Sequence, residues 1–203
     1  MAAILPRFAK GQKIGLLGGS FNPPHEGHHL ITKIALTRLR LDRVWWMVTP
    51  GNPLKSTGEL ASLEERIAQA RALLDDPRVA VTGFEAQIGA RYTCDGIAYL
   101  KARAPGVKFV WLMGADNLTQ FHLWRNWRAI ADATPIAVID RPGSTLKALA
   151  GPAAGALARF RLPERQAGRF ADEPPPAFIF LHGPRSNLSS SAIRAGGDVT
   201  EPS

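Results

Sequence analysis

The sequence lacks several features that mark common classes of protein. It has a single cysteine, Cys94, so no disulfide can form within the chain, which fits a reducing cytoplasm. No apolar run approaches the roughly 20 residues needed to span a bilayer. The first residues also lack the apolar stretch of a secretory signal. We therefore expect a cytoplasmic protein with no membrane partner.

Common nucleotide-binding and metal-binding patterns are missing as well. Neither Gly-x-x-x-x-Gly-Lys-Ser/Thr nor Gly-x-Gly-x-x-Gly occurs, which argues against a P-loop NTPase and a dinucleotide dehydrogenase. No cysteine pair or acidic partner stands at zinc-ligand spacing from the histidines. We expect no metal held by protein ligands alone.

Acidic residues are outnumbered: 25 Lys+Arg against 17 Asp+Glu give a net charge of +8. A basic chain can bind nucleic acid, an anionic membrane or small polyanionic substrates. The basic residues are scattered rather than grouped, and no aromatic pattern of RNA-binding domains accompanies them. We expect phosphate-bearing small molecules and no nucleic-acid partner. A basic nucleic-acid-binding module is the alternative from a different class.

The 203 residues suit one α/β domain, residues 1–203, in which apolar strands alternate with helical patterns. This alternation predicts a Rossmann-like, doubly wound, mostly parallel sheet of about five or six strands with helices on both faces. Residues 143–176 are rich in Ala, Gly and Pro, and we expect a variable and partly mobile connector there. The expected strands cover residues 13–18, 44–49, 78–82, 108–113, 135–140 and 177–182.

Helices are expected between these strands. Apolar residues recur at helical spacing from Leu30 to Leu39, and Ser62 with Glu65 forms a capping box that opens another helix. Further helical patterns run over residues 95–103 and 123–131, and a short last helix over 189–194. Ligands in such folds bind beyond the carboxyl ends of the strands.

The segment after the first expected strand reads Gly18-Gly19-Ser20-Phe21-Asn22-Pro23-Pro24-His25-Glu26-Gly27-His28. Glycines at a strand end let a ligand approach the backbone, and His28 stands at a helix start, where free amides favour an anion. Two histidines three residues apart can donate hydrogen bonds to phosphate oxygens. A purely structural turn is the alternative, but it leaves the histidines unexplained.

Two further segments carry similar alternatives. Leu188-Ser189-Ser190-Ser191-Ala192-Ile193-Arg194 offers hydroxyls, amides and a guanidinium to a phosphate, or else a plain serine cap beside a solvated arginine. Asp116, in Gly114-Ala115-Asp116-Asn117, can accept from a ribose hydroxyl or a magnesium-bound water, or else cap the next helix.

These motifs, in this order, resemble the nicotinate-nucleotide adenylyltransferase family of the HxGH nucleotidyltransferase superfamily, from Lys13 to Arg194. Arg91-Tyr92-Thr93-Cys94-Asp95 and Trp124 resemble its pyridine-nucleotide side, although Arg125 stands where many relatives carry Tyr. Leu54, beside Lys55, stands where the family often has His. We interpret Cys94 as a packing residue, and the tryptophans other than Trp124 as core.

The resemblance implies a site of three parts. The catalytic residues are His25, His28 and Arg194. The residues that bind ATP are Gly18, Gly19, Ser20, Phe21, Gly114, Asp116, Ser189, Ser190 and Ile193. The residues that bind nicotinate mononucleotide are Asn52, Lys55, Tyr92, Thr93 and Trp124.

The implied reaction moves AMP from ATP to nicotinate mononucleotide, giving nicotinate adenine dinucleotide and pyrophosphate. Mg²⁺ is expected to bind through the ATP phosphates. The sequence leaves nicotinamide mononucleotide or another phosphate acceptor open as alternative substrates, and it leaves a homo-oligomer open too.

Overall fold

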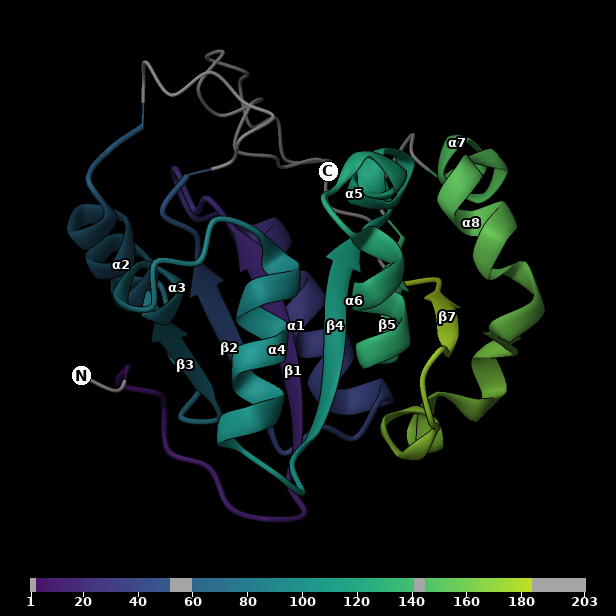
Figure 1. Cartoon of the computed structure of the whole chain (residues 1–203), viewed down its shortest axis with the longest axis horizontal. Coiled ribbons are helices and arrows are strands. Elements are labelled where there is room, and N and C mark those ends of the chain that lie inside the picture. Colours follow the sequence, from purple (N-terminus) through teal and green to yellow (C-terminus); the bar gives the residue numbers. More distant parts are fainter. Residues whose placement is uncertain (1–2, 52–59, 141–144, 184–203) are drawn as a thin grey trace, which may run out of the picture.

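The computed structural model describes residues 3–51, 60–140 and 145–183 (Figure 1). Its centre is a seven-stranded sheet in the order β3-β2-β1-β4-β5-β7-β6, and every pairing in it is parallel. The strands are β1 (Lys13–Gly19), β2 (Arg43–Val48), β3 (Val79–Thr82), β4 (Lys108–Gly114), β5 (Ile136–Ile139), β6 (Arg161–Leu162) and β7 (Phe178–Leu181).

The number of strands corrects the sequence prediction of five or six. The extra strand is β6, which pairs two residues with β7 at one edge of the sheet. A strand of two residues leaves no alternation of apolar and polar positions in the sequence. The remaining strands lie within one or two residues of their expected bounds.

Helices connect the strands. Those of α-type are α1 (Glu26–Arg38), α2 (Leu63–Ala72), α3 (Phe84–Gln87), α4 (Thr93–Arg103), α5 (Ala115–Gln120), α6 (Trp127–Ala133), α7 (Thr145–Ala150) and α8 (Pro152–Leu157). Those of 3-10 type are η1 (Phe121–Leu123), η2 (Ala158–Phe160) and η3 (Glu164–Asp172). The predicted capping box of α2 is confirmed, since the Ser62 side chain accepts from the Glu65 amide and Glu65 accepts from the Ser62 amide.

One prediction about helices differs from the structure. The single helix expected over residues 123–131 is instead η1 and α6, separated at Asn126, whose φ of 51° is left-handed. Residues 145–173 contain α7, α8, η2 and η3. The helix expected over residues 189–194 falls outside the described part of the chain.

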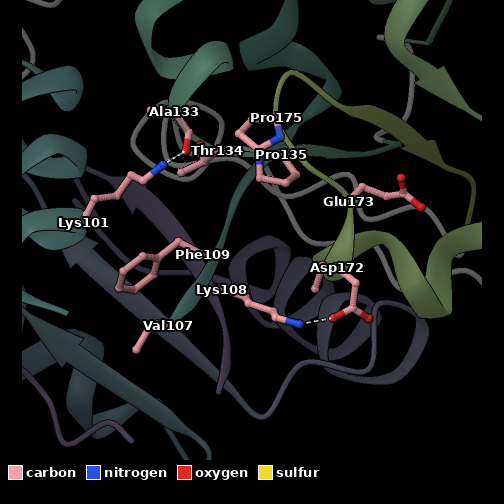
Figure 2. Close-up of a pocket in the computed structure, with 11 residues that line it drawn as sticks. Lys101, Val107, Lys108, Phe109, Ala133, Thr134, Pro135, Asp172, Glu173 and Pro175 are labelled. Carbon is pink, nitrogen blue, oxygen red and sulfur yellow. Dashed lines mark hydrogen bonds and ion pairs between the residues drawn. The ribbon is translucent and has the colours of Figure 1, made fainter. Parts of the chain in front are cut away.

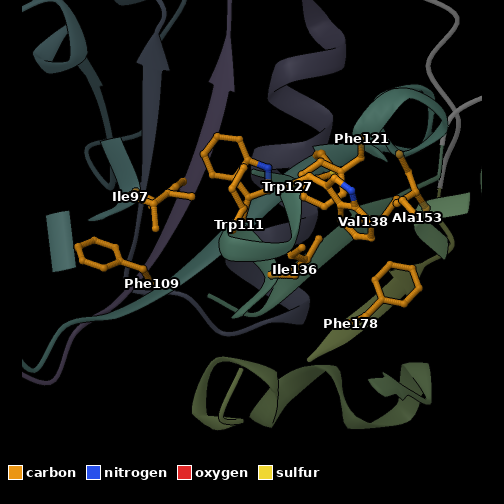
Figure 3. Close-up of a cluster of buried hydrophobic side chains, with 14 of the residues drawn as sticks. Ile97, Phe109, Trp111, Phe121, Trp127, Ile136, Val138, Ala153 and Phe178 are labelled. Carbon is orange, nitrogen blue, oxygen red and sulfur yellow. The ribbon is translucent and has the colours of Figure 1, made fainter. Parts of the chain in front are cut away.

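The sheet has a separate hydrophobic core on each face. Neighbouring residues of one strand alternate between the two cores, so Trp45 packs on one side and Trp46 on the other. The core that contains Trp45 also holds Trp111 and Trp127, and Figure 3 shows residues of this core converging from β4, β5, β7 and the helices above them. Trp45, Trp46, Trp111 and Trp127 are all buried, so their predicted place in the core is confirmed.

The strand order places a topological switch point between β1 and β4. The chain leaves β1 towards β2 on one side and reaches β4 on the other, so the segments after β1 and β4 diverge at this position. Register aligns the two ends, because Leu17 pairs with Leu112 and each strand runs two residues further, to Gly19 and Gly114.

Among the described helices, none has the length and apolar character needed to cross a membrane.

Candidate active site

His25 and His28 form the capping box at the start of α1. Nδ1 of His25 accepts the backbone N–H of Gly27 at 3.0 Å, and Nδ1 of His28 accepts the backbone N–H of His25 at 3.2 Å. Histidines therefore do the work that Ser or Thr and Glu or Gln do in the common form of this motif. The predicted place of His28 at the start of a helix is confirmed.

These two hydrogen bonds fix the form of both imidazoles. A ring nitrogen that accepts an N–H carries no proton, so in each neutral ring the proton sits on Nε2. His25 is 6% exposed and its ring centroid lies 4.0 Å from that of His28. Each ring thus carries its N–H on Nε2, and both rings lie at the carboxyl end of the sheet, the end at which ligands bind in folds of this kind.

An aromatic cluster packs His28 against the core. The centroid of the Phe21 ring lies 4.4 Å from that of His28 and 5.1 Å from that of Trp46, and the centroids of His28 and Trp46 lie 5.8 Å apart, so the three rings contact one another. The indole N–H of Trp46 donates to the Thr32 hydroxyl at 2.8 Å. The Phe21 side chain is fully buried, so only its backbone could face a nucleotide, and its predicted role in ATP binding stays a prediction.

A side chain at Gly18 and one at Gly19 would meet different neighbours. A Cβ on Gly18 would lie 2.5 Å from the Trp111 ring, so packing alone requires glycine there. A Cβ on Gly19 would lie 3.3 Å from the Phe21 ring and 3.8 Å from Nε2 of His28. The bare backbone at Gly19 therefore borders the histidine pair, as a site that admits a phosphate close to the strand requires.

Gly114 and Asp116 lie at the other side of the switch point. Gly114 ends β4 and caps α5 with no side-chain hydrogen bond, and Asp116 lies in the first turn of that helix, half-buried. Asp116 is therefore not the cap residue that one interpretation of the sequence allowed. Its carboxylate stands next to the switch point, which suits the predicted contact with the ATP side.

The predicted pyridine-nucleotide residues come together from two segments. Tyr92 precedes α4, Thr93 is its first residue, and Trp124 follows η1. Trp124 is half-buried against Trp111 and Phe121, while the guanidinium of Arg125 lies 5.8 Å from the centroid of the Tyr92 ring. Tyr92 is 38% exposed, so part of its side chain remains accessible although Arg125 lies over the ring.

Six predicted site residues fall outside the described part of the chain: Asn52, Lys55, Ser189, Ser190, Ile193 and Arg194. Their roles stay predictions. Cys94 is described, and it is half-buried; burial and the neighbouring Asp95 raise the pKa of its thiol. A raised pKa disfavours the thiolate, which fits the interpretation of Cys94 as a packing residue.

Sequence reasoning missed Arg66, which is 1% exposed. It donates to the carbonyls of Ser20 at 2.8 Å, Thr49 at 2.7 Å, Ala61 at 2.9 Å and Pro50 at 3.2 Å. The sequence does hold a signal: Leu63, Ile67 and Ala70 form an apolar stripe, and Arg66 lies within that stripe. A cation on a buried helix face needs several acceptors, and the loops after β1 and β2 supply them.

Glu85 was missed too, and no pattern in the sequence points to it. It lies in α3, 4% exposed, and burial together with the nearby Asp95 raises the pKa of its carboxyl to about 7. A Cβ on Gly96 would lie 2.6 Å from Oε1 of Glu85, so the carboxyl packs directly against the first turns of α4. Glu85 therefore packs against the start of α4, the helix at whose beginning Tyr92 and Thr93 lie.

A surface cavity of about 180 Å³ lies at the opposite end of the sheet (Figure 2). Lys108, the first residue of β4, and Pro135, just before β5, line it. Its lysines are already engaged, since Lys108 pairs with Asp172 at 2.7 Å and Lys101 donates to the Ala133 carbonyl at 2.6 Å. This cavity is separate from the candidate site.

Comparison with known proteins agrees with this geometry. Residues 16–196 match the family model described as cytidylyltransferase-like. The chain belongs to the cytidylyltransferase-like family. Relatives of this chain include two proteins named "probable nicotinate-nucleotide adenylyltransferase". The Agrobacterium fabrum protein is 58% identical over 89% of this chain and 97% of that protein. A Methylorubrum extorquens protein is 60% identical over 90% of this chain and 98% of that protein. The resemblance predicted from the motifs is thus confirmed.

Solved structures share the fold of this cytidylyltransferase-like chain. A Plasmodium falciparum nicotinic acid mononucleotide adenylyltransferase complexed with NaAD superposes with a TM-score of 0.66 at 16% identity, covering 91% of this chain and 83% of that one. A second structure of that enzyme, complexed with APC, gives 0.65 at 15% identity over the same shares. The α/β, Rossmann-like class predicted from the sequence is confirmed.

Proposed function

We propose that this protein transfers AMP from ATP to nicotinate mononucleotide and releases pyrophosphate. A phosphate oxygen of the mononucleotide attacks the α-phosphorus of ATP. As that P–O bond forms, the bond from the α-phosphorus to the oxygen that bridges to the β-phosphorus breaks. The products are nicotinate adenine dinucleotide and pyrophosphate, and no covalent enzyme intermediate is needed because a phosphate oxygen is already a nucleophile.

One observation carries this proposal: the reciprocal capping of His25 and His28 at the switch point. It leaves the N–H of each neutral ring on Nε2, and Nε2 of His28 would lie 3.8 Å from a Cβ on Gly19. The high identity to relatives named nicotinate-nucleotide adenylyltransferase supports the choice of reaction and acceptor.

In this mechanism the protein supplies positioning and charge stabilisation. His25 and His28 donate to triphosphate oxygens whose negative charge grows as the leaving bond breaks, so these bonds strengthen in the transition state. Trp124 and Tyr92 offer aromatic faces to the pyridine ring. Arg194, Ser189 and Ser190 would hold the leaving pyrophosphate, as the sequence motif predicts.

Mg²⁺ would enter with ATP rather than in a protein cage. The described residues hold no group of three or more His, Cys, Asp or Glu that could surround a metal ion. The single carboxylate of Asp116 beside the switch point fits an ion that keeps most of its waters and needs one acceptor for them. The ion would neutralise phosphate charge when bound.

The proposal is tested by measuring pyrophosphate release from ATP and Mg²⁺ with each mononucleotide at equal concentration. Turnover chiefly with nicotinate mononucleotide supports it. Comparable turnover with nicotinamide mononucleotide would keep the chemistry and change the specificity. Absence of turnover with both would refute the acceptor, and phosphopantetheine and flavin mononucleotide would then be assayed.

A further inference from the structure

Arg66 joins three segments that border the candidate site. Its Nη1 donates both to the Ser20 carbonyl, in the loop after β1, and to the Thr49 carbonyl, directly after β2. Its Nη2 donates to Pro50, and its Nε to Ala61, just before α2. The planar guanidinium can satisfy acceptors from several directions at once, which a single ammonium cannot match.

The two loops have different tasks in the proposed reaction. Ser20 belongs to the glycine-rich segment that leads to His25 and His28, on the ATP side. Thr49 and Pro50 lead into the segment that is expected to contact the mononucleotide. Arg66 is thus one hydrogen-bonded link between the two substrate sides. The Thr49 N–H donates to the Gly19 carbonyl at 3.0 Å, and the Ala61 N–H donates to Oδ1 of Asn22 at 3.4 Å.

A purely structural interpretation accounts poorly for this residue. A buried guanidinium is costly, and an apolar side chain would suit the stripe of Leu63, Ile67 and Ala70 better. Within the described part of the chain, Arg66 forms no salt bridge; its hydrogen-bond acceptors are four backbone carbonyls. Glu64 attracts this positive charge, but no carboxylate of the described residues lies within salt-bridge distance of it, and the charge lies beside a site that receives two polyanions.

We propose that Arg66 is a positioning residue that fixes the loop after β1 relative to the loop after β2, and so aligns the attacking phosphate with the α-phosphorus of ATP. The proposal rests on the proposed function. In-line displacement depends on the relative placement of two substrates, and an error of about 1 Å can cost on the order of 100-fold in rate. Each loop keeps its own residues without Arg66, so each substrate still binds.

The test compares Arg66→Lys with Arg71→Lys, an exposed arginine of the same helix. Pyrophosphate release is measured against each substrate in turn, well below the midpoint of thermal unfolding of each variant. For Arg66→Lys we expect kcat to fall about tenfold or more while each KM changes less than about threefold. Arg71→Lys is expected to match the wild type.

A second variant separates geometry from folding. Arg66→Ala opens space for a small cation, so methylguanidinium at concentrations too low to denature the protein should restore part of kcat, and sodium chloride at equal ionic strength should not. A folded Arg66→Lys protein with wild-type kcat would overturn the proposal. So would variants that are unfolded at every temperature, since that result assigns Arg66 to stability alone.

The outcome for Arg66 is distinct from the outcome for the proposed function. Absence of turnover by the wild-type protein with either mononucleotide refutes the reaction itself, and with it this proposal. Normal turnover by the wild type together with an unaffected Arg66→Lys variant refutes only the positioning role.

Discussion

Phe21 and His28 are in ring contact, with centroids 4.4 Å apart. Phe21 also has a left-handed φ of 48°, which non-glycine residues rarely adopt. Because Phe21 is also fully buried against Trp46, the core compensates for the strained backbone. The hydrophobic core of one sheet face thus continues directly into the histidine pair. Packing of Phe21 against Trp46 therefore helps to hold the His28 ring in place.

Changing Phe21 is therefore expected to affect catalysis as well as stability. Phe21→Leu keeps an apolar side chain but removes the ring contact to His28, and we expect kcat to fall by roughly threefold to tenfold with a loss of stability of about 1–2 kcal/mol. Phe178→Leu, in β7 and equally buried, is the matched control. Similar kcat losses in both variants would contradict a specific role for the contact between Phe21 and His28.

The capping box lets stability and catalysis be separated at His28. Glu is a favoured residue at the third position of a capping box, so His28→Glu keeps the cap while it replaces an N–H donor by a negative charge. We expect this variant to unfold close to the wild-type temperature and to lose on the order of 100-fold or more in kcat. Steady-state pyrophosphate release and thermal unfolding measure the two effects.

His28→Ala completes the comparison, because it removes both the donor and the half of the capping box that accepts from the His25 amide. We expect a similar loss of kcat and, in addition, about 1 kcal/mol of stability. An unchanged kcat in His28→Ala would remove His28 from the mechanism.

Sequence patterns predicted the parts of this molecule that depend on local chemistry. Repeated apolar strands bounded by Gly and Pro predicted the parallel sheet, and the glycine- and histidine-rich segment predicted a site at the end of β1. The reciprocal bonds of His25 and His28 were not foreseen, because capping by histidine follows from backbone geometry. Arg66 was missed because its partners are carbonyls of loops 5 to 46 residues away, and a carbonyl has no sequence signature.

Glu85 makes stability depend on pH. Burial raises the pKa of its carboxyl from 4.5 to about 7, so the folded state holds the proton more tightly than the unfolded state does. The stabilisation is complete below pH 4.5 and is lost as the pH rises to about 7. The loss amounts to about 3 kcal/mol. Glu85→Gln keeps the shape without the charge.

We therefore expect Glu85→Gln to have nearly wild-type stability at pH 4 and to exceed the wild type at pH 8. Denaturant unfolding at several pH values between these limits measures the difference. The gap should open between pH 4.5 and 7, the interval between the two pKa values. Parallel stability profiles for the two proteins would show that Glu85 ionises in the folded state as it does in the unfolded state.

Arg125 offers a test of the choice between acid and amide substrate. Its guanidinium lies over the Tyr92 ring, next to Trp124, and it forms no salt bridge within the described residues. A positive charge near the pyridine ring favours a carboxylate over a neutral amide, and at an exposed position such an attraction is worth about 1 kcal/mol. Arg125→Gln is expected to lower the ratio of kcat/KM for nicotinate over nicotinamide mononucleotide by roughly threefold to tenfold.

Arg128 is the matched control for this prediction. It is also exposed and also stacks on an aromatic ring, with its guanidinium 4.5 Å from the centroid of the Trp127 ring, but Trp127 itself is buried. Arg128→Gln removes the same charge from the protein and should leave the ratio unchanged. Because the effect of Arg125 is electrostatic, it should shrink as salt is added. An equal fall in both variants would instead indicate a general effect of net charge on anion binding.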